Sequence, residues 1–309
     1  MYYIGIDVGG TNLKAGLVSE EGAILAVSRT PLHFTTAEAF AEILADLSRK
    51  VMAEAGVSPQ QIQSVGIGIP GAVEGDTVLF TANIPMRDIP LGKLFRQHLD
   101  LPVTLANDAD CAAAAEFLFG SGKGTRDFVT VTLGTGVGGG LILGGRLHTG
   151  KCCAGEVGHM VIDMDGEACS CGRRGCWESY ASATGLIRMA KEAALAHPDS
   201  ALNRLEEING QTIFASADAG DETALAVTHK YVNYLAAGIT NLVNILQPEV
   251  VAIGGGVAAA PEHLLLKPVQ QLVHDHCYGR HVGHYPTVTR ASMGNDAGIV
   301  GAALIEKLL

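Results

Sequence analysis

Residues 4–18 read IGIDVGGTNLKAGLV, which is an apolar stretch, a glycine-rich turn and a second apolar stretch. This order predicts a β-hairpin whose turn is made by the glycines. The same plan recurs over residues 129–143, where an apolar strand leads into a Gly-Thr-Gly turn and a further apolar strand. We therefore expect the two halves of the chain to be built alike.

Two further apolar strands also end in glycine. Residues 65–69 precede Pro70 and Gly71, and residues 250–253 precede three consecutive glycines. Between the strands lie apolar residues at three- and four-residue spacing and one alanine-rich run, which predict helices. The expected helices cover residues 37–55, 109–119 and 223–246. Strands that alternate with helices predict an α/β protein.

The four glycine turns have two interpretations. A glycine at the end of a strand most often serves turn geometry. Bare backbone N–H groups beside a threonine hydroxyl, as in two of these turns, are also suited to holding phosphate oxygens. Neither hairpin turn has the P-loop pattern Gly-x-x-x-x-Gly-Lys-[Ser/Thr]. The turns alone leave both interpretations open.

Composition narrows the class of protein. The 309 residues are 48% apolar and 17% charged, so we expect a globular protein with a sizeable core, most simply in two domains. Acidic residues exceed basic ones by 11 (32 − 21), which argues against an extended nucleic-acid surface and favours a small partner. The sequence has no apolar run of membrane-spanning length and begins without a secretory pattern. We therefore expect a cytoplasmic protein.

The seven cysteines are an odd number, and three of them fall within residues 169–176. In a reducing compartment such a cluster favours metal binding over disulfides. With a nearby histidine, the three cysteines offer a closed set of four ligands suited to structural zinc. A loop of free cysteines beside an unrelated histidine would have the same sequence pattern. The candidate ligands are His159, Cys169, Cys171 and Cys176. Cys111 fits a helix face, and Cys152 and Cys153 have no assigned role.

Three motifs combine along the chain. They are Asp7-x-Gly9-Gly10-Thr11-x-x-Lys14, the turn Leu133-Gly134-Thr135-Gly136, and Glu156-Val157-Gly158-His159 followed by Cys169-Ser170-Cys171-Gly172-Arg173-Arg174-Gly175-Cys176-Trp177-Glu178. Together they resemble the ROK family (repressor, open reading frame, kinase), and the resemblance runs from the first strand to Gly298. It implies the actin-like ATPase (ribonuclease H-like) fold, with two α/β domains of related topology and ATP in the cleft between them. The smaller domain is expected at residues 1–116 plus 295–309, and the larger, which carries the zinc loop, at residues 117–294.

The resemblance also implies roles for single residues. The nucleotide is expected at three places: the first hairpin, the turn at residues 134–136 and the glycines that follow residues 250–253. The residues are Asp7, Gly9, Gly10, Thr11, Lys14, Gly134, Thr135, Gly136, Gly254, Gly255 and Gly256. The sugar is expected at Gly71, Asn107, Asp108, Glu156, His159 and Glu178. The family's zinc cysteines have the same spacing, so His159 would bind zinc through one ring nitrogen and face the sugar with the other. Asp7 would carry Mg²⁺ through water or be a turn residue, and Lys14 would contact a phosphate or be an exposed strand residue.

Asp108 is the expected catalytic base. It follows a strand-like run and stands at a helix start, where backbone N–H dipoles keep a carboxylate ionised. Asn107 and Asp108 would serve equally as plain helix caps. By the resemblance, Asn107 binds sugar hydroxyls and Asp108 accepts the proton of the 6-hydroxyl. The family's run often has Asn where this chain has Asp110, and this departure leaves the base in place.

The resemblance implies an ATP-dependent hexose kinase that uses Mg²⁺ and a structural Zn²⁺, with glucose as the expected substrate. N-Acetylmannosamine, N-acetylglucosamine, fructose, mannose and allose are alternatives, and so is polyphosphate as donor. Two other functions are alternatives to the kinase. The family also contains sugar-responsive repressors, which have a DNA-binding segment ahead of the first hairpin. A protein that binds a sugar without phosphorylating it would not need Asp108. A homodimer or homotetramer is expected. Because the zinc loop carries sugar-binding groups, loss of zinc is expected to weaken sugar binding before ATP binding.

Overall fold

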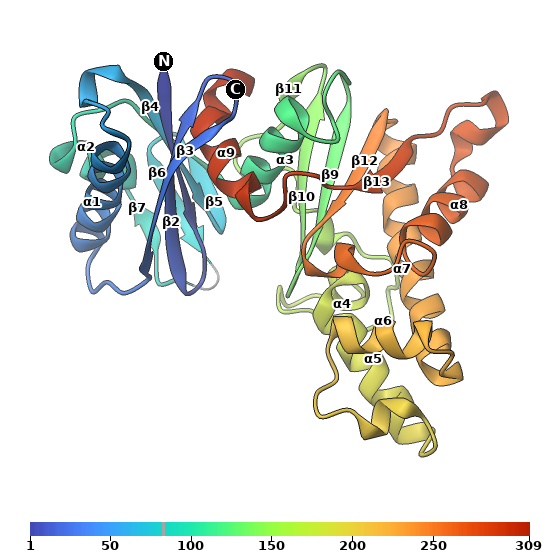
Figure 1. The fold of residues 1–309 in the computed structure, drawn as a ribbon. Helices are drawn as coiled ribbons and strands as arrows, with labels where there is room; N and C mark the ends of the chain where they lie inside the picture. Colours follow the sequence, from blue (N-terminus) through green and yellow to red (C-terminus); the bar gives the residue numbers. More distant parts are fainter. Residues whose placement is uncertain (82–83) are drawn as a thin grey trace. The chain divides into compact units, whose positions relative to one another are not determined.

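The computed structural model describes residues 1–81 and 84–309 and shows a mixed α/β fold (Figure 1). The chain divides into two compact units. The first comprises residues 1–124, 140–155 and 292–309, and the second comprises residues 125–139 and 156–291. The domain limits expected from the sequence, at residues 116/117 and 294/295, stay a prediction.

A five-stranded sheet of order β3-β2-β1-β4-β8 forms the base of the first unit. Strands β1 (Tyr2–Val8) and β2 (Asn12–Ser19) pair antiparallel, which confirms the predicted hairpin. Strand β3 (Ile24–Pro31) pairs antiparallel with β2. Strand β4 (Ile62–Ile69) runs parallel to β1, and β8 (Val103–Asn107) runs parallel to β4. The carboxyl ends of β1, β4 and β8 therefore meet at one edge of the sheet.

Helices lie on both faces of this sheet (Figure 1). One face carries α1 (Ala37–Ala55) and α2 (Leu91–His98), and the other carries α3 (Asp108–Phe119) and α9 (Ala297–Leu304). The bounds of α1 follow from its caps, because Thr36 accepts the N–H of Ala39 and Gly56 adopts a left-handed conformation. A smaller sheet is formed by β5 (Gly71–Glu74), β6 (Thr77–Thr81) and β7 (Arg87–Ile89).

Helix α9 approaches the first sheet so closely that only glycine fits beneath it. A Cβ atom at Gly5 of β1 would lie 1.8 Å from the carbonyl oxygen of Ile299, and one at Gly66 of β4 would lie 1.7 Å from that of Ala302. Ile299 belongs to an apolar layer that is almost fully buried. Part of the glycine excess therefore serves helix-to-sheet packing.

The second five-stranded sheet has the order β11-β10-β9-β12-β13. Its strands are β9 (Phe128–Leu133), β10 (Val137–Leu143), β11 (Arg146–Leu147), β12 (Val250–Gly254) and β13 (Thr287–Arg290). Strand β12 runs parallel to both β9 and β13. In sequence order, β9, β10, β11, β12 and β13 take the places that β1, β2, β3, β4 and β8 have in the first sheet. This match confirms the prediction that the two halves are built alike.

The helices of the second unit are α4 (Glu178–Ala181), α5 (Ala183–Ala196), α6 (Gly210–Asp218), α7 (Glu222–Leu246) and α8 (Leu266–His276). Helix α7 confirms the long helix expected over residues 223–246. Trp177 and Tyr231, both fully buried, are the largest side chains of this unit's core. Among the described residues, no helix has both the length and the apolar character that a membrane span requires.

Candidate functional site

The first glycine turn joins β1 to β2. The N–H of Gly9 donates to the carbonyl oxygen of Asn12 at 3.0 Å, which closes the turn and leaves Gly10 and Thr11 exposed. No atom of the described residues lies within 4 Å of the position that a Cβ of Gly10 would take, so a ligand has access to the backbone there. Exposed backbone N–H groups beside a hydroxyl are the groups that bind phosphate oxygens.

Asp7 and Lys14 are directly opposite each other across the same hairpin. Burial raises the pKa of Asp7, and the positive charge of Lys14 partly offsets this rise. A Cβ on Gly298 would lie 2.8 Å from the carboxylate carbon of Asp7, which shows that the start of α9 encloses this side chain. A nearby cation would favour the ionised form of such a partly desolvated carboxylate.

The second glycine turn, residues 134–136, joins β9 to β10 and is held from outside by residues 178–184. Inside the turn, the N–H of Gly134 donates to the carbonyl oxygen of Gly136 at 3.0 Å. From outside, Glu178 Oε2 accepts the N–H of Val137 at 3.0 Å, and a Cβ on Gly136 would lie 2.3 Å from that oxygen. A side chain at residue 136 would therefore displace this carboxylate.

The third glycine turn follows β12, next to the end of β9. Gly255 has a positive φ of 83°, and its Cβ would lie 2.3 Å from the carbonyl oxygen of Leu133. Gly254 is in register with Thr132 of the parallel strand β9. The second and third turns therefore lie at the carboxyl ends of neighbouring parallel strands, the usual place for ligand-binding residues in α/β sheets.

Asn107 and Asp108 lie where β8 meets α3. Asn107 is the cap of α3, because its Oδ1 accepts the N–H of Ala109 at 2.8 Å and that of Asp110 at 3.4 Å. Its Nδ2 donates to the carbonyl oxygen of Gly71 at 3.1 Å. Asp108 shares this capping role, because its Oδ1 also accepts the N–H of Ala109, at 3.0 Å, and its side chain is exposed in the first turn of the helix.

Three carboxylates of the first unit gather around one buried thiol. Burial raises the pKa of Cys111 well above its usual value, and the charges of Asp110, Asp108 and Asp7 raise it further. Cys111 itself packs below Gly68 of β4, whose Cβ would lie 3.1 Å from its Sγ. Asp7 and Asp108, predicted from motifs far apart in the sequence, therefore lie in one region of the first unit.

The four candidate zinc ligands lie together in the second unit, with their donor atoms all within 4.8 Å of one another. The Sγ of Cys169 is 3.7 Å from Nδ1 of His159, and the Sγ atoms of Cys171 and Cys176 are 3.6 Å apart. Ligands at about 2.3 Å from a tetrahedral zinc ion are about 3.8 Å apart, so this arrangement fits the ion. His159 turns Nδ1 toward the cysteines.

The thiols of this cluster have contrasting surroundings. Burial raises the pKa of Cys176 to about 12, whereas a backbone hydrogen bond from Arg173 lowers the pKa of Cys171. Zinc binds thiolates, so metal binding at this cluster would release protons. Gly175 has a φ of 71°, and its Cβ would lie 1.4 Å from the carbonyl oxygen of Asp163, so only glycine fits at this turn between Cys171 and Cys176.

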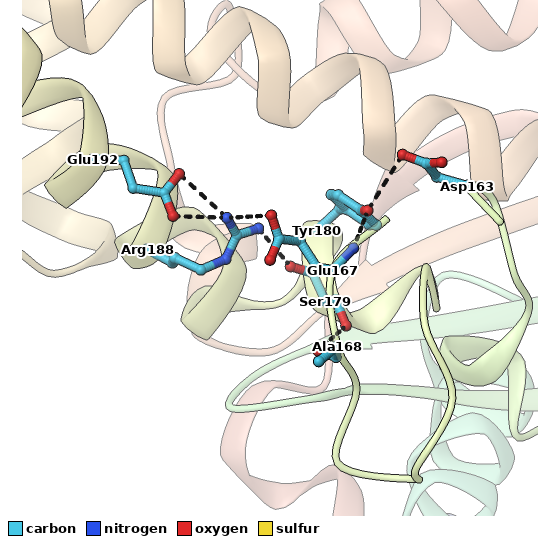
Figure 2. A network of polar contacts seen from close by, with 7 residues as sticks. All are labelled: Asp163, Glu167, Ala168, Ser179, Tyr180, Arg188 and Glu192. Carbon is cyan, nitrogen blue, oxygen red and sulfur yellow. Dashed lines mark hydrogen bonds and ion pairs between the residues drawn. The ribbon is translucent and has the colours of Figure 1, made fainter. Parts of the chain in front are cut away.

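A polar network fixes the metal loop, residues 159–176, to α4 and α5 (Figure 2). The hydroxyl of Tyr180 accepts the N–H of Glu167 at 2.7 Å, and the hydroxyl of Ser179 donates to the carbonyl oxygen of Ala168 at 3.3 Å. Arg188 of α5 forms ion pairs with the carboxylates of Glu167 and Glu192 at 3.1 Å and 3.0 Å. The loop is therefore supported by the protein as well as by any metal.

Trp177, between the candidate zinc ligand Cys176 and Glu178, has a packing role. Its indole N–H donates to the carbonyl oxygen of Tyr234 at 2.9 Å, and its ring lies over Gly238 of α7. The side chain is fully buried. Trp177 thus anchors the end of the metal loop to the longest helix of the second unit.

Glu116, the residue at which the sequence predicts a domain limit, also has a structural role. Its buried carboxylate accepts the N–H of Met293 at 2.6 Å, the N–H and hydroxyl of Ser121 at 2.9 and 2.7 Å, and the hydroxyl of Ser292 at 3.2 Å. Burial alone would raise the pKa of Glu116, but these bonds outweigh it and lower the pKa below its usual value. The carboxylate thus ties α3 to the segment that leads into α9.

The chain is similar to proteins of one family over nearly its full length. The sequence pattern of the ROK family matches residues 3–308. A glucokinase of Halalkalibacterium halodurans is 36% identical over 315 residues, which cover 99% of this chain and 95% of that protein.

Solved structures give the same result. The crystal structure of a ROK family glucokinase from Streptomyces griseus in complex with glucose and AMPPNP is similar with a TM-score of 0.80 and 35% identity, and 98% of each chain is covered. A ROK family transcriptional regulator, described as a homologue of the E. coli MLC protein, has a TM-score of 0.89 and 27% identity over 99% of this chain and 78% of its own. The paired sheets are the actin-like ATPase fold of these relatives, and the chain belongs to the ROK family.

Proposed function

We propose that the chain is a kinase that transfers the γ-phosphoryl group of ATP to the 6-hydroxyl of glucose. Its similarity to two glucokinases, one crystallised with glucose and AMPPNP, supports this activity. The observation on this chain that carries the proposal is the arrangement of Asn107 and Asp108 at the start of α3. Asn107 accepts two backbone N–H groups of the first turn, and the carboxylate of Asp108 beside it is exposed, so a sugar hydroxyl has access to it.

Asp108 is proposed to accept the proton of the 6-hydroxyl while the hydroxyl oxygen attacks the γ-phosphorus. The bond from this phosphorus to the bridging oxygen breaks, and ADP leaves with the electron pair. The N-terminus of α3 favours the ionised form of Asp108. Asn107 uses one amide hydrogen for the carbonyl oxygen of Gly71 and keeps a second for a sugar hydroxyl.

The nucleotide phosphates are proposed to bind at the first and second glycine turns, and the adenosine at the third. The exposed threonines of the two hairpin turns, Thr11 and Thr135, each offer a hydroxyl and a backbone N–H. Asp7 is proposed to hold the magnesium ion of ATP through water, which fits a carboxylate whose burial favours a cationic neighbour. Bound Mg²⁺ would offset the charge on the phosphoryl oxygens.

The remaining sugar hydroxyls are proposed to bind Glu156, His159 and Glu178. Zinc on the cysteine cluster would fix the ring of His159, because a metal on Nδ1 leaves Nε2 pointing in one direction. Hydrogen-bonding groups that a bound sugar covers give discrimination, since a sugar that lacks the matching hydroxyl leaves them unpaired. The zinc is thus proposed to be structural.

The experiment that tests the proposal is a coupled ADP-release assay over hexoses and N-acetylhexosamines, with ATP and with polyphosphate as donors. We expect the highest kcat/KM for glucose with ATP. A higher value for N-acetylmannosamine or fructose would correct the sugar and keep the kinase. Tight glucose binding without ADP release would favour a regulator, the second function that the similarity to the MLC homologue supports.

A further inference from the structure

We propose that residues 178–184 form a brace that positions the second glycine turn for the nucleotide, and that Thr184 is a positioning residue within it. This inference rests on the proposed function, because it assigns the turn to ATP phosphates. It extends that function by coupling the turn to the metal loop through residues of the second unit alone.

On one side, the brace forms hydrogen bonds with the turn at three residues. Glu178 Oε2 accepts the N–H of Val137 at 3.0 Å, and the N–H of Ala183 donates to the carbonyl oxygen of Gly134 at 2.8 Å. The hydroxyl of Thr184 donates to the carbonyl oxygen of Thr135 at 2.8 Å. Both peptide planes that flank Thr135 are thereby oriented. The direction of the N–H groups offered to a phosphate is set by the same planes.

On the other side, the brace is continuous with the metal loop. It begins two residues after the zinc ligand Cys176, and Glu178 Oε1 lies 3.9 Å from the Sγ of Cys169. Ser179 and Tyr180 hold the loop backbone at Ala168 and Glu167 (Figure 2). Glu178 therefore touches both structures, with one carboxylate oxygen on the glycine turn and the other near a zinc ligand.

This arrangement changes the expected effect of metal loss. The sequence alone suggested that zinc would support sugar binding first, since sugar-binding residues flank the loop. The contacts show that one short segment supports both the metal loop and the glycine turn. When the metal loop loses its order, the Glu178 carboxylate loses its fixed position, and the turn loosens with it. Nucleotide binding is therefore expected to depend on zinc.

The test compares full-length, zinc-loaded protein with its Thr184→Val and Thr184→Ser variants. Valine keeps the shape of threonine and removes the donor, whereas serine keeps the donor. Thr212→Val is the matched control, because Thr212 also donates to backbone carbonyls of the second unit, those of Glu207 and Asn209, at a different place in the unit. The readouts are zinc content and the dissociation constants of AMPPNP and glucose, each measured by calorimetry.

We expect Thr184→Val to weaken AMPPNP binding by about 3- to 10-fold, the range of one lost hydrogen bond. Zinc content and glucose affinity should stay within about twofold, and the Thr184→Ser and Thr212→Val variants should bind AMPPNP as the wild type does. Removal of zinc by a chelator should weaken AMPPNP binding together with glucose binding. The emission of Trp177, the chain's single tryptophan, then reports whether the metal loop has moved.

Unchanged AMPPNP affinity in Thr184→Val overturns the brace and leaves the proposed kinase standing. The same holds if chelation weakens glucose binding and spares AMPPNP binding. A zinc-loaded wild type that binds no AMPPNP overturns the proposed function and the inference together.

Discussion

Replacement of Gly238 by alanine should destabilise the second unit, although alanine is the better helix former. Gly238 lies inside α7, where alanine is favoured over glycine by about 1 kcal/mol. A Cβ at this position would lie 2.1 Å from Cε2 and 2.4 Å from Nε1 of Trp177. Carbon atoms in contact are normally about 3.5–4.0 Å apart, so the indole must move by more than about 1 Å.

The size of the effect follows from what the displaced indole loses. Overpacking of a core costs about 1–3 kcal/mol, and an unpaired buried N–H in place of the bond to Tyr234 costs about 1–3 kcal/mol more. After the gain in helix propensity, Gly238→Ala should lower the free energy of unfolding by about 1–5 kcal/mol. Gly210→Ala is the matched control, because this helical glycine has no described atom within 4 Å of its Cβ position.

The loss of stability in Gly238→Ala can be measured by urea unfolding followed by tryptophan emission, because Trp177 is the only tryptophan in the sequence. Gly238→Ala should unfold at lower urea than wild type, with red-shifted native emission, and Gly210→Ala should match wild type. The smaller ring in a Gly238→Ala, Trp177→Phe double variant should recover part of the loss, measured by circular dichroism. Wild-type unfolding and emission in Gly238→Ala would refute the assigned packing of Trp177 on α7.

Three further outcomes are expected. Glu116→Gln should lower stability at neutral pH by about 1–3 kcal/mol, because two backbone donors lose an ionised acceptor; a urea midpoint equal to wild type would contradict this. The lowered pKa of Glu116 means that its contribution is present above the unfolded pKa near 4.3 and is lost as pH falls through the folded value, so the variant's stability should depend less on pH between about 5 and 3. Gly136→Ala should raise the KM for ATP at least about 10-fold with little change in melting temperature, since the added methyl group displaces the Glu178 carboxylate from Val137; an unchanged KM would show that this contact is not needed.

The sequence predicted those parts of the fold that depend on local pattern. The hairpin around residues 9–11 and the helix over residues 37–55 have strong periodicity and clear turn or cap residues, and both are confirmed. The close approach of α9 to Gly5 and Gly66 had no local signal, because it joins segments more than two hundred residues apart. These glycines therefore stayed unexplained until the packing was known.

In the candidate site, too, local patterns were predictable and long-range contacts were not. The cysteine spacing predicted the metal cluster because its four candidate ligands lie within 18 residues (159–176), so a short loop brings them together. The role of Glu116 had no such signal, since two of its donor residues, Ser292 and Met293, lie far along the chain. Phosphate approach at Gly136 stays a prediction, and its close contact with Glu178 had no signal in the sequence.

The role of Asp108 as the base of a glucose kinase can be tested by turnover in a single variant. Zinc-loaded wild type and Asp108→Asn are compared for formation of glucose 6-phosphate from ATP and glucose, with glucose affinity measured in parallel. Asp46→Asn, on the exposed face of α1, is the control for loss of a carboxylate. Asp108→Asn should lower kcat by about 10²–10⁴-fold and bind glucose nearly as the wild type does. Turnover at the wild-type rate in Asp108→Asn would show that Asp108 is not the base.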